Sequence, residues 1–331
     1  MKIAYIDLGV NRPRESYALN PKRYGGGACF ARYAKIELNT SNDLFDIHAP
    51  IESFNELGED EGRSGCFGLT EAEMSAMRNG ENIRGYIKDA EKYDIFVYHH
   101  DCLAINASGL SGKLVSWSLM GDNGAQHPST PYVLLYRPGE QARYGKGFPV
   151  TIGKFVPSCF TYPSLKTESL FQCSRHDVHM NTIEVAKFCL ANKNISGIFA
   201  GPILDNYPLI DYINNKDTVY LGLISEIDKL DYCKQAIATT YLHTWDTAFN
   251  LSAIESLSVG TPIIAAKRGC FEYIIEEGVN GYFWQSGDDL SALVEKCKRL
   301  DPLKVWETAH RFSHKAMVRS FHKAFQEILS L

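Results

Sequence analysis

The chain has 331 residues, of which 45% are hydrophobic and 22% are charged. This composition is typical of a globular protein with a sizeable core, and it excludes a mainly disordered, collagen-like or coiled-coil chain. At about 100–200 residues per domain, the length indicates two domains or one large one. The formal net charge of −5 excludes an overall basic field for binding nucleic acid and leaves only a local basic patch open.

Nine cysteines are spread singly along the chain, without a C-x-x-C pair. Their odd number and spacing argue against a zinc site or a disulfide framework and favour a reducing compartment. The N-terminal apolar run is short and interrupted by Asp7, unlike a signal peptide. No apolar stretch approaches the roughly 20 residues that span a bilayer. We therefore expect a cytoplasmic protein without a transmembrane segment.

The first element is an apolar run at Lys2–Leu8 that predicts a buried strand. A polar loop follows and ends in Gly25, Gly26 and Gly27, after which residues 28–39 have apolar side chains at helical spacing. A strand, a glycine-rich loop and a helix form the opening unit of a nucleotide-binding α/β domain. The sequence thus predicts such a domain at the start of the chain.

The rest of the first half contains further strand and helix patterns. We predict a surface loop at 58–68, a helix at 81–93, and strands at 94–101, 113–120 and 131–139. Strands separated by helices or long loops indicate a mostly parallel sheet. A proline-rich stretch without periodicity at 150–168 marks the domain junction, so we assign residues 1–160 to the first domain and 161–310 to the second.

The second half is more regular. We predict strands at 169–174, 196–201, 218–225, 237–244 and 261–269, helices at 180–194, 226–236 and 249–260, and an almost entirely helical stretch at 303–331. Glycine at the end of the 249–260 helix is a common C-terminal stop. Repeated strand–helix units predict a second doubly wound domain.

One segment, residues 241–284, carries a specific pattern. Its features are Phe249-Asn250-Leu251, Ile254-Glu255, Ser258-x-Gly260-Thr261-Pro262-Ile263, Glu272-Tyr273-Ile274 and Glu277-Gly278-Val279-Asn280-Gly281. In order and spacing this segment resembles the nucleotide-sugar-binding core of family 4 glycosyltransferases. That family has the GT-B fold, in which two Rossmann-like doubly wound domains face each other across a cleft.

Shorter matches follow in the order of the family. They are the strand 94–100 ending in His99 and His100, Ser174-Arg175, the strand ends at 199–202 and 220–225, and Arg311-Phe312-Ser313. The last of these resembles the start of the family's closing helix, so we expect residues 311–331 to cross back to the first domain.

The resemblance implies a glycosyltransferase that moves a hexosyl or pentosyl group from a nucleotide diphosphate sugar to an acceptor hydroxyl, with retention at the anomeric carbon. It implies UDP-sugar as the donor, and neither a metal nor a cofactor. It assigns donor binding to Gly25, Gly26, Gly27, Arg175, Gly201, Ile224, Thr247, Asn250, Leu251, Ser252 and Glu255. Catalytic roles fall on His99, His100, Arg175 and Asp246.

Elementary chemistry is consistent with these roles. A helix that begins near Asn250 directs unpaired N–H groups at its N-terminus, where a diphosphate is stabilised; the alternative is an ordinary capped helix. The Glu255 carboxylate can accept both ribose hydroxyls, or it lies on a solvated helix face. The planar fork of Arg175 suits phosphate oxygens, or it forms a surface ion pair. Gly25–Gly27 allow close backbone approach to phosphates, or they form a flexible turn.

His99 and His100 end a predicted strand, and adjacent residues there point to opposite sides. Only one of them is therefore expected near the donor sugar, and the alternative is a structural histidine. Adjacent histidines do not easily share a metal ion, and no third ligand is evident.

Three positions depart from the family pattern. Thr247 stands where the family has the first glutamate of Glu-x7-Glu, Met180 where it has a lysine, and Asn250 where it has a glycine. We predict that Asp246 supplies the missing acid. The lost cation leaves His176, His179 and Lys166 as candidates to compensate.

The acceptor stays open. A carbohydrate or a lipid-linked sugar is the first expectation. A modified base in DNA is the alternative, with Lys22, Arg23, Lys113, Arg137, Arg143 and Lys146 as a local basic face. A sugar-nucleotide 2-epimerase and a non-catalytic sugar-nucleotide binder are two further alternatives.

Overall fold

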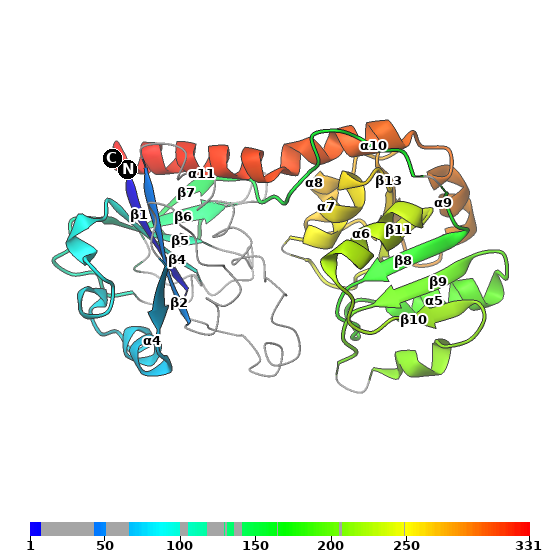
Figure 1. The fold of residues 1–331 in the computed structure, drawn as a ribbon, viewed down its shortest axis with the longest axis horizontal. Helices are drawn as coiled ribbons and strands as arrows, with labels where there is room; N and C mark the ends of the chain where they lie inside the picture. Colours follow the sequence, from blue (N-terminus) through cyan, green and yellow to red (C-terminus); the bar gives the residue numbers. More distant parts are fainter. Residues whose placement is uncertain are drawn as a thin grey trace. The chain divides into compact units, whose positions relative to one another are not determined.

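The computed structural model describes residues 1–7, 43–50, 66–99, 105–117, 129, 131–135, 141–163, 165–204, 207–247 and 249–331. They form two compact units, Met1–Ile152 with His314–Leu331, and Gly153–Ser313 (Figure 1). Each unit contains its own sheet of parallel strands. The predicted α/β class with two doubly wound domains is therefore confirmed.

The sheet of the first unit has the strand order β3-β2-β1-β4-β5-β6-β7. The strands are β1 (Lys2–Asp7), β2 (Leu44–Pro50), β3 (Cys66–Leu69), β4 (Ile95–His99), β5 (Lys113–Trp117), β6 (Tyr132–Leu135) and β7 (Lys146–Pro149). The middle of β1 is apolar on both faces and fully buried from Ile3 to Ile6. That pattern suits a central strand of a parallel sheet, because such a sheet is covered on both sides.

Two predictions in the first unit are wrong. Residues 81–93 are not one helix but two short 3-10 turns, η2 (Ile83–Gly85) and η3 (Ala90–Lys92). Gly85 weakens a helix, and Asp89 adopts a left-handed backbone with φ 51°, which ends helical geometry. Of the predicted loop 58–68, residues 66–68 belong instead to the edge strand β3, because they pair with β2.

Two helices complete the described part of this unit, α4 (Glu71–Arg78) and the C-terminal α11 (His314–Leu329). Phe321 of α11 packs its ring edge against Trp117 of β5, with ring centroids 5.7 Å apart. The Thr151 N–H donates to Ser320 Oγ at 2.9 Å. The apolar face of the last helix thus completes the core of the first unit.

The sheet of the second unit has the strand order β10-β9-β8-β11-β12-β13. The strands are β8 (Ser169–Cys173), β9 (Ser196–Ala200), β10 (Thr218–Tyr220), β11 (Ala238–Tyr241), β12 (Ile263–Ala266) and β13 (Gly281–Trp284). The chain proceeds outward from β8 to β10 and then returns to pair β11 with β8. In an open sheet of this kind, ligands bind beyond the carboxyl ends of the strands at that reversal.

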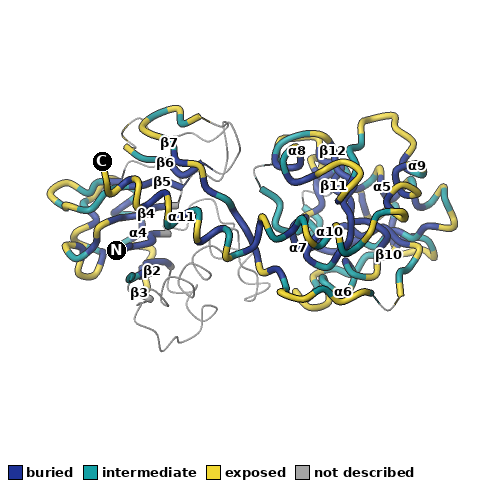
Figure 2. The backbone as a smooth tube through the Cα atoms, turned by 90° about the horizontal axis from the view of Figure 1, so that it is seen from above, coloured by how far each residue is buried: buried dark blue, intermediate teal, exposed yellow. Residues whose placement is uncertain are grey.

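Helices cover both faces of this sheet (Figure 1). The described helices of this unit are α5 (Thr182–Ala191), η5 (Pro208–Tyr212), α6 (Glu226–Gln235), α7 (Leu251–Ser258), α8 (Phe271–Ile274), α9 (Leu290–Cys297), α10 (Pro302–Ala309) and η6 (His310–Phe312). Figure 2 shows that buried residues concentrate in the strands and on the inner sides of the helices. All four residues of β11 and of β12 are buried, as expected for central strands of a parallel sheet that is covered on both sides.

The units divide after Ile152 and after Ser313, whereas the sequence placed the divisions at 160 and 310. Residues just after Ile152 pack within the second unit. The Lys154 N–H donates to the Phe312 carbonyl at 2.9 Å, and Val156 joins the apolar core around Tyr241. None of the helices in the described part of the chain combines the length and the apolar composition of a membrane span.

Candidate functional site

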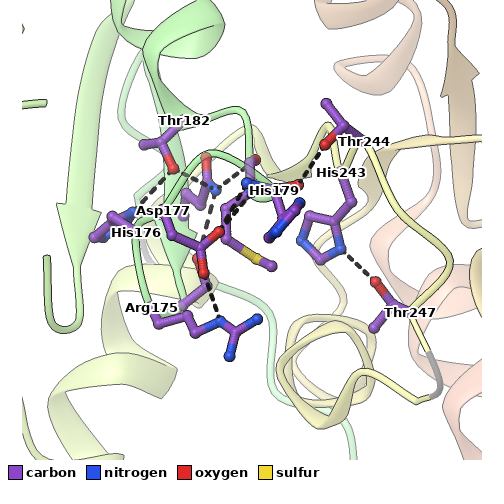
Figure 3. Close-up of polar contacts among 11 residues, drawn as sticks. Arg175, His176, Asp177, His179, Thr182, His243, Thr244 and Thr247 are labelled. Atoms are coloured by element: carbon purple, nitrogen blue, oxygen red, sulfur yellow. Dashed lines mark hydrogen bonds and ion pairs between the residues drawn. The ribbon is translucent and has the colours of Figure 1, made fainter. Parts of the chain in front are cut away.

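A polar loop follows β8 at the strand reversal of the second unit, and its centre is Asp177 (Figure 3). The Asp177 carboxylate is buried; it accepts the N–H groups of His179 at 2.8 Å and of Met180 at 3.2 Å. Its other oxygen lies 2.8 Å from Arg175 Nε. Asp177 therefore fixes both the loop and the direction of Arg175.

Arg175 is exposed and lies two residues after the end of β8. Its Cζ is 5.4 Å from the centroid of the Trp245 ring, which belongs to the loop after β11. His179 stacks on the same indole, with ring centroids 5.4 Å apart. The ion pair with Asp177 uses one of five guanidinium N–H donors, so Arg175 retains donors for a phosphate group.

His176 is fully buried and is not a compensating cation. Its Nε2 lies 3.0 Å from the Ala200 carbonyl and its Nδ1 3.0 Å from Thr182 Oγ1. Burial lowers its pKa to about 4. Because a carbonyl only accepts, Nε2 carries the proton of the neutral ring, and Nδ1 accepts from the Thr182 hydroxyl. This histidine ties the β8 loop to β9 and α5.

His243 is a buried residue at the end of β11 that the sequence analysis missed. Its Nδ1 lies 2.6 Å from Thr247 Oγ1. Burial lowers its pKa to about 4, against a smaller opposing effect of the Asp177 charge. Its Nε2 is buried without a hydrogen-bond partner among the described residues. The only available signal was its position near the end of the strand predicted at 237–244.

The loop that carries Trp245, Asp246 and Thr247 is held on two sides. The Thr244 N–H donates to the His179 carbonyl at 2.9 Å, and the Cys270 N–H donates to the Thr247 carbonyl at 2.9 Å. Gly269 has φ +58°, and a Cβ there would lie 2.6 Å from Thr247 N and O. The close approach of these two loops therefore requires glycine. Asp246 itself is exposed.

Helix α7 begins directly after this loop. The Asn250 side chain accepts the Ala253 N–H at 3.0 Å and so caps the helix. Leu251 and Ser252, in its first turn, are partly exposed. The capping interpretation of Asn250 thus holds, and it is compatible with an anion near the same helix end.

Glu255 lies deeper in α7, and its carboxylate is buried. It forms ion pairs with Lys154 through Oε1 and with Lys229 through Oε2, the latter at 2.8 Å. Lys154 Nζ also lies 3.1 Å from a Glu226 oxygen. The alternative of a solvated helix face is therefore wrong, since the carboxylate belongs to a buried ion cluster. Its contact with ribose stays a prediction.

Neither Met180 nor Lys166 supplies a cation at this edge of the sheet. Met180 is buried. Lys166 Nζ donates to the Ala236 carbonyl at 2.7 Å and to Thr261 Oγ1 at 2.9 Å. Ala236 and Thr261 precede β11 and β12, so Lys166 lies at the amino ends of the strands. Burial lowers its pKa to about 8.

Gly201 and Ile224 follow β9 and β10. Gly201 has φ +117°, and a Cβ there would lie 1.8 Å from the Ser174 carbonyl oxygen. Glycine is thus required where the end of β9 passes the loop after β8. Ile224 is partly buried against the apolar cluster around Phe171. Both residues lie on the same edge of the sheet as Arg175.

The predicted residues of the first unit are described only in part. Gly25, Gly26, Gly27 and His100 lie outside the described residues, and His99 is the last residue of β4. Within the described part of the chain, no group of three or more histidine, cysteine, aspartate or glutamate side chains could hold a metal ion.

Part of the chain matches a known protein family. The family model described as Glycosyl transferases group 1 matches residues 183–319, which include β9 to β13 and α7. None of the curated proteins compared with the chain matches it.

Solved structures match the whole chain. The apo form of the lipopolysaccharide outer core galactosyltransferase WaaB has a TM-score of 0.71 at 16% identity, covering 99% of this chain and 100% of that one. AviGT4, a glycosyltransferase involved in avilamycin A biosynthesis, has a TM-score of 0.67 at 15% identity, with coverages of 100% and 98%. Anabaena Alr3699/HepE in complex with UDP-glucose has a TM-score of 0.65 at 15% identity, with coverages of 100% and 99%. The chain has the GT-B fold, as predicted.

Proposed function

We propose that this protein is a retaining glycosyltransferase that transfers a sugar from a UDP-sugar to an acceptor hydroxyl. In this proposal the second unit binds the nucleotide and the first unit contributes the acceptor side. The observation that carries it is the position of Arg175, an exposed guanidinium oriented by the buried Asp177 at the strand reversal of the second sheet. Strands β9 to β13 of that sheet lie within the residues that match the group 1 glycosyltransferase model.

The chemistry of the leaving group explains why this position matters. Cleavage of the sugar–phosphate bond leaves a nucleoside diphosphate with an additional negative charge. Fixed donors aimed at that charge lower the barrier, because they need little reorganisation during the reaction. Arg175 and the first N–H groups of α7 follow the adjacent strands β8 and β11, so both are suited to hold the diphosphate.

The sugar end of the donor is proposed to lie near the loop of His243 and Thr247. In this chain Thr247, hydrogen-bonded to the neutral His243, stands where the related family has a carboxylate. Both groups form hydrogen bonds without carrying charge. Asp246, exposed beside Thr247, is the proposed acidic partner. The ribose hydroxyls are proposed to bind Glu255.

Retention and the acceptor class are tested together by a turnover assay. Purified protein is incubated with UDP-sugars and with carbohydrate, lipid-linked sugar and hydroxymethylated duplex DNA acceptors. We expect sugar transfer to one class, with the donor's anomeric configuration in the product by NMR. Arg175→Ala should reduce turnover at least about tenfold, as expected for loss of a charge-assisted contact. Arg299→Ala, a change at an exposed arginine after α9, should leave it unchanged.

Other outcomes contradict the proposal in distinct ways. An inverted product would reject retention. An epimeric nucleotide sugar formed from the donor alone would identify a 2-epimerase. Tight UDP binding without turnover on any acceptor would identify a non-catalytic binder. Equal turnover by Arg175→Ala and the wild type would remove Arg175 from the site.

A further inference from the structure

We propose that Lys154 and Lys229 bind the diphosphate of the donor. When the ribose hydroxyls bind the Glu255 carboxylate, the two ammonium groups leave that carboxylate and contact the phosphates. This inference rests on the proposed function. It concerns two lysines to which the family pattern in the sequence assigns no role. The feature that carries it is the ion cluster of Lys154, Lys229, Glu226 and Glu255 within the second unit.

The cluster is largely withdrawn from water. The side chains of Glu255, Lys154 and Lys229 are 4%, 9% and 15% exposed, whereas that of Glu226 is 50% exposed. Two ammonium groups thus share one buried carboxylate, and the second carboxylate lies half in water. Burying long charged side chains costs both hydration and rotamer freedom. An arrangement this costly, on the helix that begins at the strand reversal, indicates a binding role.

Both lysines are brought to Glu255 by the framework of the unit. The backbone of Lys154 is fixed by its N–H bond to the Phe312 carbonyl, and a Cβ on the preceding Gly153 would lie 2.3 Å from the same oxygen. Lys229 lies on α6, whose N-terminus is capped by the Ser225 hydroxyl, which accepts from Asp228 N–H. The two ammonium groups therefore approach Glu255 from separate, well-defined segments.

The charge of the ligand supplies the reason for the exchange. A nucleoside diphosphate carries at least two negative charges, and Arg175 is the only arginine or lysine in the loop of residues 174–181 that follows β8. If ribose hydroxyls donate to Glu255, they compete with the ammonium groups for the same oxygens. Lysine side chains have flexible stems and three donors, so they can move a few ångströms to the adjoining phosphates. Each buried charge then keeps a partner throughout binding.

This exchange predicts a dependence on the number of phosphates. Binding of uridine, UMP and UDP, and of guanosine, GMP and GDP, is measured by calorimetry for the wild type, Lys154→Met and Lys229→Met. Each variant should lose about tenfold or more in affinity for the preferred diphosphate and less than about threefold for its nucleoside. The salt dependence of diphosphate binding should also weaken. Lys187→Met, at an exposed lysine of α5, is the matched control and should bind like the wild type.

The outcomes separate this inference from the function on which it rests. If the wild type binds neither diphosphate, the proposed function fails and the inference with it. Two outcomes would overturn the inference alone and make the lysines structural. In one, the wild type and both methionine variants bind UDP with equal affinity. In the other, the variants lose affinity for uridine and for UDP by the same factor. Lys229→Arg keeps the charge and should retain the affinity for the diphosphate. If Lys229→Met does not fold, the arginine variant takes its place, and a loss of diphosphate affinity in folded Lys229→Arg would also overturn the inference.

Discussion

The two buried histidines beside Asp177 make the second unit sensitive to acid. His176 and His243 both have a pKa of about 4 in the folded chain, lowered by burial from 6.5. Between these values the unfolded chain binds more protons than the folded one, so stability falls as the pH decreases. From pH 8 to pH 5 each histidine should lower the free energy of unfolding by about 2 kcal/mol, and the two together by about 4 kcal/mol. That is a large part of the usual stability of a domain.

Urea unfolding at pH 8 and at pH 5, followed by tryptophan fluorescence, measures this loss. Three of the four tryptophans, at positions 245, 284 and 306, belong to the second unit. His176→Gln and His243→Gln should each remove about half of the pH-dependent loss, because glutamine does not titrate. The reasoning is refuted if the double variant of the buried histidines loses as much stability between the two pH values as the wild type.

Three further changes test the framework of the site. Asn250→Ala removes the cap of α7 and should cost the second unit about 1 kcal/mol in urea unfolding, and an unchanged midpoint would show that the cap bond contributes nothing. Gly201→Ala forces a Cβ to within 1.8 Å of the Ser174 oxygen at φ +117°; we expect loss of the second unit's cooperative unfolding transition, and a wild-type transition would contradict the required glycine. Lys166→Met removes two hydrogen bonds at the amino edge of the sheet. It should lower the melting temperature and leave the affinity for UDP unchanged. Weaker UDP binding by a fully folded variant would place Lys166 in the site.

Local patterns were sufficient for most of the second unit. Strands β8 and β12 are short, mainly apolar runs, and β11 places two β-branched threonines, Thr239 and Thr240, between Ala238 and Tyr241. The glycine stop after α7 occurs at Gly260, with φ +76°. These features depend on neighbours in the sequence. In residues 81–93 the same kind of pattern failed, because Asp89 adopts a left-handed backbone that periodicity does not indicate.

The ion cluster at Glu255 could not be predicted from the sequence. Lys154 is 101 residues from Glu255, and their pairing depends on how the segment after Ile152 runs beside Phe312. The bond between His243 and Thr247 spans four residues, yet it needs the loop geometry imposed by Gly269. The sequence therefore indicated which positions depart from the family pattern, but the contacts that replace the missing groups arise only from the tertiary structure.

The most direct measurement is a crystal structure of the protein with a bound UDP-sugar. The account predicts phosphate oxygens within hydrogen-bond distance of the Arg175 guanidinium and the first N–H groups of α7, with a ribose hydroxyl on Glu255. A nucleotide bound elsewhere on the chain, with Arg175 still in contact only with Asp177 and Trp245, would contradict it.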